Sequence, residues 1–383
     1  MSPPQFEATA GSARELKHVA IFLADLQGGG AERMMVNLAG GLARKEIRVD
    51  LLLANTDGPY LAEVQKSVRL VELNAGRVLR ALPLLTSYLR RERPQLLLTT
   101  LHHASVVALL ARRLSNTHIP VFIREANTPS QQEPSLRRPK SWLITKMIRR
   151  LYRQADGVIA VSKGVAEDLE RYFGHPIHQT AVLYNPVVTD ELGRLACLEP
   201  EHSWFEPDAP PVILAVGRLH VQKDFATLIH AFARLQKERD SRLMILGEGN
   251  ERSELEGLVR QLGLEGRVAL PGFVENPFAF MSRAGVFVLS SRWEGLPGAL
   301  IQAMACGCPV VATDCRSGPA EVLDNGRYGE LVQVGDIAGM AEAIVRTLDS
   351  ARQPAQVQAR SQRYSQAEIV DDYVEYFEGK LAL

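Results

Sequence analysis

The stretch SSRWEGLPGALIQAMACGCPVVATD, residues Ser290–Asp314, contains the local patterns of an α/β fold in one order. An apolar run, Ala284–Leu289, comes directly before it and predicts a buried strand. A helix is predicted next by apolar residues at helical spacing, namely Leu300, Ile301, Met304 and Ala305. Gly307 and Pro309 end that helix, and the run Val310–Thr313 predicts the following strand. This succession is typical of a parallel sheet covered by helices.

The loop between the first strand and the helix has the composition of an anion site. Gly295, Leu296, Pro297 and Gly298 carry no polar side chain, so backbone N–H groups and a helix N-terminus can approach a negatively charged ligand. Glu294 places one carboxylate beside this loop. We therefore predict a ligand site here.

Length and composition predict a globular protein of two domains. The chain has 383 residues, which is too many for one ordinary hydrophobic core. Its contents of 46% hydrophobic and 23% charged residues are average for a globular protein. The net charge is zero, but residues 1–200 carry 26 Lys and Arg against 19 Asp and Glu, and the remainder carries 18 against 25. We expect the basic first half to meet phosphates or a membrane surface. No run approaches the ~18 apolar residues of a membrane-spanning helix.

Strands and helices alternate twice, which predicts two α/β domains with parallel, doubly wound sheets. The first set of strands is expected at Val19–Ala24, Val49–Ala54, Arg69–Leu73, Gln95–Thr100, Pro120–Arg124, Gly157–Val161 and Thr180–Leu183, with helices at Arg77–Arg91, Ala104–Leu114, Leu136–Gln154 and Gly164–Tyr172. The second set has strands at Val212–Val216, Arg242–Leu246 and Val268–Leu270, and helices at Asp224–Gln236, Arg252–Leu262, Ile337–Asp349 and Gln366–Gly379. We expect a disordered lead without a secretory signal at 1–16, a first domain at 17–190, a Pro-rich acidic linker at 191–210, a second domain at 211–365 and a last helix at 366–383.

Gly28, Gly29 and Gly30 follow the first predicted strand and open a helix. A dinucleotide-binding site is one interpretation, but the GxGxxG spacing counted from Gly28 places Arg33 where a third small residue belongs. No acidic residue ends a clear second strand at the required distance. A turn that lets a phosphate or sugar approach the backbone is favoured, and a turn that only packs is the alternative.

Polar residues follow two neighbouring predicted strands of the first domain. His102 and His103 follow one strand, and Arg124, Glu125 and Asn127 end the next. Ligands of doubly wound sheets bind at the carboxyl ends of the strands. These five residues are therefore candidate ligand contacts, with capping or packing roles as the alternative.

A basic segment, residues 137–153, has seven cations and no acidic residue. Apolar residues at helical spacing, from Leu143 to Leu151, would form one face of a helix. Such a helix is typical of contact with an anionic bilayer, and a core-packing helix with a solvated basic face is the alternative. Nucleic-acid binding is disfavoured because no recognised motif or stacking pattern is present. The candidate membrane contacts are Arg137, Arg138, Lys140, Lys146, Arg149, Arg150 and Arg153.

Two cations follow the first strand of the second domain. Arg218 comes directly after Gly217, and Lys223 lies five residues further on. Two positive charges at a strand's carboxyl end, in the same domain as the Glu294 loop, suit a diphosphate and could stabilise charge on a departing nucleotide. A pair of surface cations is the alternative.

The four cysteines are predicted to be small buried residues of a reducing compartment. Cys197, Cys306, Cys308 and Cys315 form no CxxC pair and have no nearby His at metal-ligand spacing. We therefore expect neither a metal site nor a cofactor.

Together these motifs resemble the retaining nucleotide-sugar glycosyltransferases of family 4, which have two facing Rossmann-like domains, the GT-B architecture. The resemblance covers nearly the whole chain. It rests on GGGAER at Gly28–Arg33, GRLHVQKD at Gly217–Asp224, LGEGNER at Leu246–Arg252, PGFVEN at Pro271–Asn276 and EGLPGALIQAMACGCPVVATD from Glu294. It implies that the first domain binds the acceptor, that the second binds the donor, and that the last helix crosses back to the first.

The resemblance also implies roles for single residues. Arg218 and Lys223 would grip the donor diphosphate, Glu294 would bind hydroxyls of the donor sugar, and His103, preferred over His102, would be the histidine of the N-terminal domain. The implied donor contacts are Gly28, Gly29, Gly30, Gly217, Phe273, Val274, Gly295, Leu296, Pro297, Gly298 and Gln302. Gln302 departs from the family's pattern, which has a second acid at this position. Glutamine keeps an acceptor oxygen but no charge, so we expect retained but altered nucleotide binding.

The expected function is transfer of a sugar, with retention of configuration and without a metal, from a nucleotide diphosphate donor. A UDP-sugar is expected by family frequency. The expected acceptor is a lipid-linked glycan in bacterial cell-surface polysaccharide or glycoconjugate assembly, and the expected location is cytoplasmic and peripheral at the inner membrane face. A nucleotide-sugar epimerase and a non-catalytic nucleotide-sugar-binding protein are the alternatives, and no nucleic-acid partner is expected.

Overall fold

The computed structural model describes residues 15–27, 29–132, 150, 152–173, 180–236, 238–351 and 353–382. The N-terminal half contains β1 (His18–Leu23), α1 (Gly30–Arg44), β2 (Arg48–Leu53), β3 (Arg69–Glu72), α2 (Leu82–Glu92), β4 (Leu96–Thr100), α3 (His102–Ser115), β5 (Val121–Glu125), α4 (Pro129–Gln132), β6 (Gly157–Ala160), α6 (Lys163–Phe173) and β7 (Ala181–Val182). The C-terminal half contains α7 (Asp190–Ala196), β8 (Val212–Val216), α8 (Phe225–Leu235), β9 (Arg242–Leu246), α9 (Arg252–Gln261), β10 (Val268–Gly272), α10 (Pro277–Arg283), β11 (Val286–Leu289), α11 (Gly298–Ala305), β12 (Val310–Thr313), α12 (Pro319–Val322), β13 (Glu330–Val332), α13 (Ile337–Asp349), α14 (Pro354–Ser361) and α15 (Gln366–Leu381).

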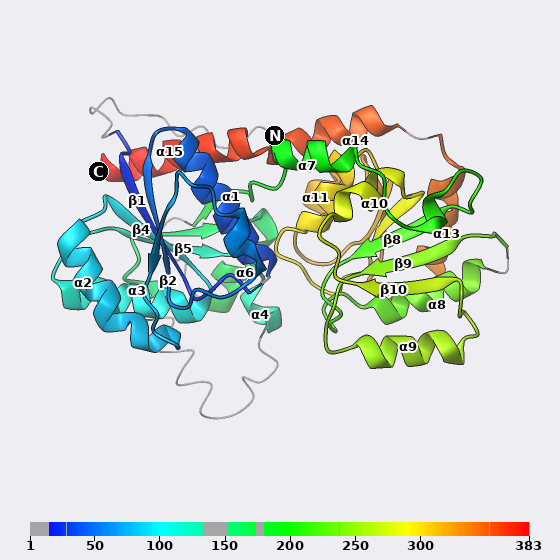
Figure 1. The fold of residues 1–383 in the computed structure, drawn as a ribbon, viewed down its shortest axis with the longest axis horizontal. Coiled ribbons are helices and arrows are strands. Elements are labelled where there is room, and N and C mark those ends of the chain that lie inside the picture. Colours follow the sequence, from blue (N-terminus) through cyan, green and yellow to red (C-terminus); the bar gives the residue numbers. More distant parts are fainter. Residues whose placement is uncertain are drawn as a thin grey trace.

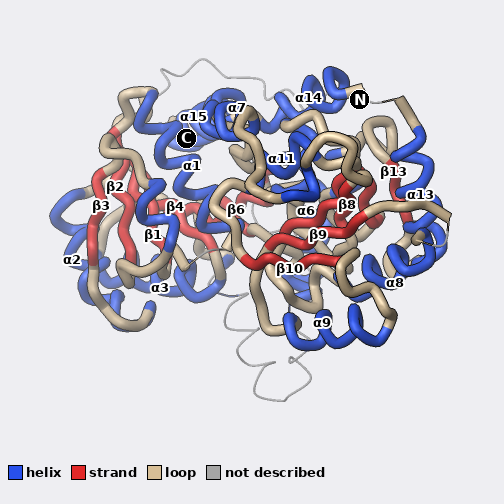
Figure 2. Tube along the Cα trace, turned by 45° about the vertical axis from the view of Figure 1, so that its right-hand side comes forward, coloured by secondary structure: helices blue, strands red, loops and turns tan. Residues whose placement is uncertain are grey.

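The strands form two sheets, one in each half of the molecule (Figure 1). The first has the order β3-β2-β1-β4-β5-β6-β7 and the second the order β10-β9-β8-β11-β12-β13. Neighbouring strands pair in parallel throughout, for example β1 with β2 and β4, and β8 with β9 and β11. Figure 2 shows the strands of each sheet between layers of helices. The predicted fold class is confirmed.

Apolar strands explain the sheets' central position. Every residue of β1 after His18 is buried, as are all residues of β4 and β11, because a parallel sheet covered on both faces leaves no strand face in water. The segment Ala284–Asp314 forms β11, α11 and β12 at the predicted positions.

Several elements differ from their predicted bounds. The helix expected from Arg77 begins as a short 3₁₀ turn, Val78–Ala81, and becomes α-helical at Leu82, where Pro83 occupies the first turn. The segment expected to be a linker contains α7, whose N-cap Thr189 accepts a hydrogen bond from the Leu192 N–H. The strand β13 and the helices α10, α12 and α14 were not predicted, because each is short and carries little periodic signal. The helix predicted at Leu136–Gln154 lies mostly outside the described residues.

The end of the chain crosses between the halves. α14 packs on α11 of the C-terminal half, whereas α15 packs on α1 of the N-terminal half (Figure 1). Gly41 allows this approach, since a Cβ there would lie 2.4 Å from Val370. Val188 and Ser365 form a parallel bridge. The connection from β7 to α7 and the connection from α14 to α15 therefore lie side by side.

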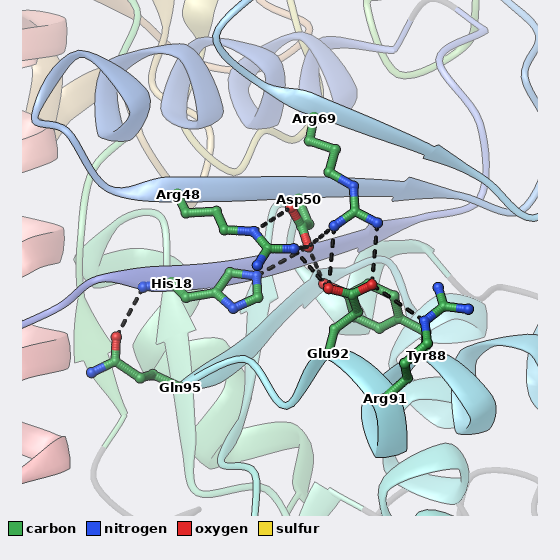
Figure 3. Close-up of polar contacts among 8 residues, drawn as sticks. All are labelled: His18, Arg48, Asp50, Arg69, Tyr88, Arg91, Glu92 and Gln95. Carbon is green, nitrogen blue, oxygen red and sulfur yellow. Dashed lines mark hydrogen bonds and ion pairs between the residues drawn. The ribbon is translucent and has the colours of Figure 1, made fainter.

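A polar cluster lies at the amino ends of β1, β2 and β3 (Figure 3). Asp50, whose side chain has no exposed surface, accepts hydrogen bonds from His18 Nε2 at 3.0 Å and from Tyr88 OH at 2.7 Å. Arg48 and Arg69 reach both Asp50 and Glu92. This cluster lies at the edge opposite the carboxyl ends of the strands, so it stabilises the sheet rather than facing a ligand there.

Candidate active site

The loop Glu294–Gly298 connects β11 to the N-terminus of α11 and is buried except at Gly298. No side chain caps α11, whose N-cap is Pro297. The N–H groups of the first turn therefore have no partner within the helix and point out of its N-terminus, where they favour a negative charge. Leu300, Ile301 and Met304 are fully buried and fix the helix on the sheet.

Glu294 and Lys223 are direct neighbours at this loop. Lys223 Nζ lies 2.5 Å from Glu294 Oε1, and Ser291 Oγ donates to the same oxygen at 2.6 Å. Lys223 is itself positioned by Ser290, whose Oγ donates to the Lys223 carbonyl at 2.6 Å. The Lys223 side chain is only 19% exposed and that of Glu294 only 8%. The ion pair is therefore largely shielded from solvent.

Arg218 extends from a turn at the carboxyl end of β8 and is exposed. The turn is held by the loop after β9: Gly217 N–H donates to the Leu246 carbonyl and Leu219 N–H to the Glu248 carbonyl. Gly249 is required there, because a Cβ would lie 2.2 Å from the Leu219 carbonyl oxygen. Arg218, the predicted diphosphate cation, therefore stands on a turn held by backbone hydrogen bonds and has an exposed side chain.

Phe273 and Val274 follow β10, which ends at Gly272. Phe273 is 63% exposed, so its backbone is accessible at the carboxyl edge of the second sheet. Gln302 is half-buried on α11, one turn inside the helix N-terminus.

The glycine turn of the N-terminal half lies opposite Arg218 of the C-terminal half. Gly29 is the N-cap of α1 and Gly30 its first residue, while Gly28 lies outside the described residues. A Cβ at Gly29 would lie 2.1 Å from a Glu32 carboxylate oxygen, so this carboxylate covers the turn. Burial raises the pKa of Glu32, Asp25 raises it further, and the Arg218 guanidinium of the other half opposes both.

The two halves contact each other directly at the loop. A Cβ on Gly295 would lie 2.2 Å from the Ala126 carbonyl oxygen, at the carboxyl end of β5. Ser162 Oγ, fully buried after β6, donates to the Gly295 carbonyl at 2.8 Å. The candidate donor loop therefore lies against the carboxyl edge of the N-terminal sheet.

A second set of contacts joins the halves beside this loop. Glu321 accepts hydrogen bonds from Lys163 N–H at 3.0 Å and from Tyr184 OH at 2.6 Å. A Cβ on Gly164 would lie 2.6 Å from Ser317 Oγ. Burial raises the pKa of Tyr184, and Glu321 raises it further, so its hydroxyl stays protonated and donates.

Sequence reasoning did not identify Ser162, Ser291 or Glu321. Only Ser162 carried a readable signal, because a serine directly after a buried strand is a typical helix N-cap, and its Oγ accepts from Val165 N–H. The partners of Glu321, namely Lys163 and Tyr184, are distant in sequence. Ser291 lies three residues before its partner Glu294, in a loop that no periodic pattern marks.

The two histidines have different surroundings. His102 Nδ1 lies 2.8 Å from Tyr152 OH and 3.7 Å from Glu125 Oε1, whereas His103 is exposed. Glu125 is buried and its Oε1 has no hydrogen-bond partner among the described residues. His103 is thus the histidine that is accessible to a ligand.

Arg124 and Asn127 lie on either side of Glu125 in the chain. Arg124 is 1% exposed and donates to Thr100 Oγ1 and Asn185 Oδ1, which places it inside the N-terminal half. Asn127 is half-buried and accepts from Thr128 N–H at 3.0 Å.

Most of the predicted membrane-contact residues lie outside the described residues, namely Arg137, Arg138, Lys140, Lys146 and Arg149. Arg150 and Arg153 are described, and both are exposed. Among the helices that can be described, none is long and apolar enough to span a bilayer.

The cysteine prediction needs one correction. Cys308 and Cys315 are buried and Cys306 is half-buried, but Cys197 is exposed, because it follows the short surface helix α7. Burial raises the pKa of Cys306 and of Cys315 to about 12, so both stay thiols at neutral pH. Within the described ranges, no three His, Cys, Asp or Glu side chains are grouped as metal ligands.

Two family models match the chain in succession: Glycosyltransferase Family 4 over residues 28–191 and Glycosyl transferases group 1 over residues 210–350. A relative from Campylobacter jejuni, N-acetylgalactosamine-N,N'-diacetylbacillosaminyl-diphospho-undecaprenol 4-alpha-N-acetylgalactosaminyltransferase, is 31% identical over 95% of this chain and 100% of its own length. The lipopolysaccharide core biosynthesis glycosyltransferase LpsE of Rhizobium meliloti is 28% identical over 82% of this chain and 84% of its own.

Solved structures share the fold at lower identity. Anabaena Alr3699/HepE in complex with UDP and glucose superposes with a TM-score of 0.79 at 21% identity, covering 94% of this chain and 98% of that one. The lipopolysaccharide outer core galactosyltransferase WaaB superposes with a TM-score of 0.69 at 22% identity, covering 94% and 98%.

Proposed function

The chain belongs to the family 4 (group 1) glycosyltransferases, and we propose that it transfers a sugar from a UDP-sugar to a lipid-linked glycan with retention of configuration. The full-length relative acts on a diphospho-undecaprenol-linked glycan, and UDP is the nucleotide in a crystal structure of the same fold. Both support the proposed substrates.

The observation that carries the proposal is the contact of Gly295 with Ala126. It brings the loop of the C-terminal half, with its acid–cation pair, against the edge of the N-terminal sheet. A donor bound at the loop would therefore face an acceptor bound at that edge.

In this proposal the C-terminal half binds the donor. Arg218 and Lys223 neutralise the diphosphate together with the N-terminus of α11, while Glu294 accepts hydrogen bonds from the sugar hydroxyls. The backbone at Phe273 and Val274 contacts the base, and Gln302 contacts the ribose. Gly217 and the loop Gly295–Gly298 allow close approach, and the turn Gly28–Gly30 closes over the phosphates from the other half.

The N-terminal half, with residues 17–190 as its proposed extent, binds the acceptor. His103 is accessible at the N-terminus of α3, and the buried Glu125 carboxylate beside His102 orients the acceptor hydroxyl. The leaving diphosphate takes the proton of that hydroxyl as the new glycosidic bond forms on the face from which the nucleotide departs. No protein nucleophile is then required.

We propose that the reaction needs no metal ion, because Arg218, Lys223 and the helix N-terminus supply the positive charge that stabilises the departing diphosphate. Turnover should be unchanged by EDTA. Activity that EDTA abolishes and Mg²⁺ restores would contradict this point. The enzyme would work at the cytoplasmic face of the membrane, where lipid-linked acceptors are assembled.

The test is UDP release over a panel of UDP-sugars, with and without a bacterial membrane lipid extract. We expect release that depends on the lipid extract and on one donor. Lys223→Ala should lower it by about 10²–10³, whereas Arg260→Ala, which removes an exposed cation of α9, should leave it unchanged. Product formed from the donor alone would indicate an epimerase, and donor binding without UDP release would indicate a binding protein.

A further inference from the structure

A cavity of about 450 Å³ lies in the N-terminal half, beside the proposed acceptor edge. Ala24 and Leu101, at the carboxyl ends of β1 and β4, form its inner wall, and His103 and Ala104 line it from the start of α3. Its remaining wall is the segment Arg77–Arg80, ahead of α2. The cavity therefore opens on the same sheet edge as the glycine turn.

The walls of this cavity are mainly apolar, since Ala24, Val78, Leu79, Leu101 and Ala104 all contribute to them. Leu79 is 69% exposed, and Leu84, one turn further along the chain, is 45% exposed. A large exposed apolar side chain, Leu79, in the wall of an apolar cavity favours an amphiphilic ligand over a free sugar, which needs polar partners.

Two cations lie beside these apolar groups. Arg77 and Arg80 both line the cavity and are exposed, and within the described residues neither guanidinium has a hydrogen bond or ion pair. Several other arginines of this half form ion pairs: Arg33 with Glu63, Arg69 with Glu92 and Arg112 with Asp156. Unpaired arginines have ten N–H donors between them and suit a phosphate or diphosphate.

We infer that this cavity binds the phosphate-bearing end of the lipid-linked acceptor. Arg77 and Arg80 bind its diphosphate, while Val78, Leu79 and Leu101 contact the first apolar segment of the lipid. The glycan then extends past His103 toward the donor loop. This inference rests on the proposed function and adds the place where the lipid anchor is recognised.

The apolar walls of the cavity favour this ligand over a soluble phosphate and over general contact with an anionic bilayer. Binding to a bilayer surface needs only exposed cations and no apolar cavity between them. A soluble diphosphate would leave Leu79 in water.

Binding to vesicles separates these possibilities. Three probes are used. The first is phosphatidylcholine vesicles that contain polyprenyl diphosphate, and the second is phosphatidylcholine vesicles given an equal negative charge by phosphatidylglycerol. The third is inorganic pyrophosphate in solution. The Arg77→Gln/Arg80→Gln variant should lose about tenfold or more in affinity for the polyprenyl diphosphate vesicles. Arg113→Gln, which removes an exposed cation near the far end of α3, is the matched control and should bind as the wild type does.

Equal losses on both kinds of charged vesicle would overturn the inference in favour of a general membrane contact. Competition by pyrophosphate as strong as that by the lipid would overturn it in favour of a soluble ligand. In the transfer assay, the double variant should raise the KM for the lipid-linked acceptor and leave the KM for the donor unchanged. An unchanged acceptor KM, with an active wild-type enzyme, refutes this inference alone, whereas a wild-type enzyme that uses no lipid-linked acceptor refutes the proposed function.

Discussion

Replacing Asp50 with asparagine should lower the free energy of unfolding by about 2 kcal/mol at neutral pH. Burial alone raises the pKa of Asp50, but hydrogen bonds from His18 and Tyr88 and the nearby Arg48 outweigh it and lower the pKa from 3.8 to about 2. This difference corresponds to about 2 kcal/mol in favour of the ionised form, since each tenfold change in proton affinity is ~1.36 kcal/mol. Asparagine keeps the size and one acceptor oxygen, so it imitates the protonated acid.

The pH dependence follows from the direction of the shift. Because the folded-state pKa lies below the unfolded one, the stabilisation is fully present above about pH 5 and is lost as the pH falls through the folded-state value. The difference between wild type and Asp50→Asn should therefore shrink to about 1 kcal/mol at pH 3.

Urea unfolding followed by circular dichroism, at pH 7 and at pH 3, measures both differences. Glu72→Gln is the control, since Glu72 is an exposed carboxylate of the same sheet, and its effect should stay within ~0.5 kcal/mol. A change of less than ~0.5 kcal/mol for Asp50→Asn at pH 7 would refute the reasoning. So would a difference that is as large at pH 3 as at pH 7, because that would assign the effect to packing rather than to charge.

Three further predictions concern the site. Lys223→Ala should lower kcat by about 10²–10³, as expected for a lost preorganised donor; near-wild-type UDP release would contradict its role. Gly295→Ala should lower kcat/KM and increase the radius of gyration in small-angle scattering, because the new Cβ would lie 2.2 Å from the Ala126 carbonyl oxygen and push the halves apart; an active enzyme of unchanged size would show that this contact is dispensable. Gln302→Glu should tighten UDP binding several-fold in calorimetry, since a carboxylate forms stronger hydrogen bonds than an amide; weaker binding would mean that Gln302 does not accept from the ribose.

Much of the fold could be predicted from local patterns. The strands that form β1, β4, β8 and β11 are nearly continuous apolar runs, and parallel sheets require such runs because both faces are covered. The helix α11 was predicted from its apolar spacing and from the Gly and Pro after it. Short elements such as α12 and β13 were missed, since three or four residues are too few to show a period.

The candidate site was partly predictable for a related reason. The carboxyl ends of parallel strands meet at one edge, so Arg218 and Glu294, which follow β8 and β11, could be expected to lie together. The glycines at 28–30 and 295 could be recognised as turns. Their contact partners could not, because Ala126 and Ser162 follow other strands and no local pattern shows which loop they contact.

The sequence by itself determined the α/β class and the succession of two parallel sheets, because these depend on residue types at short, regular spacing. Its motifs, taken in order, resembled those of a glycosyltransferase family. Only the tertiary structure decided that Lys223 meets Glu294, that Gly295 lies on Ala126, and that Asp50, inside an apolar strand, is bound by His18 and Tyr88. Each of these pairs is separated by 30 residues or more along the chain. Such contacts depend on how whole sheets and helices pack, and packing is a property of the assembled layers rather than of any local stretch.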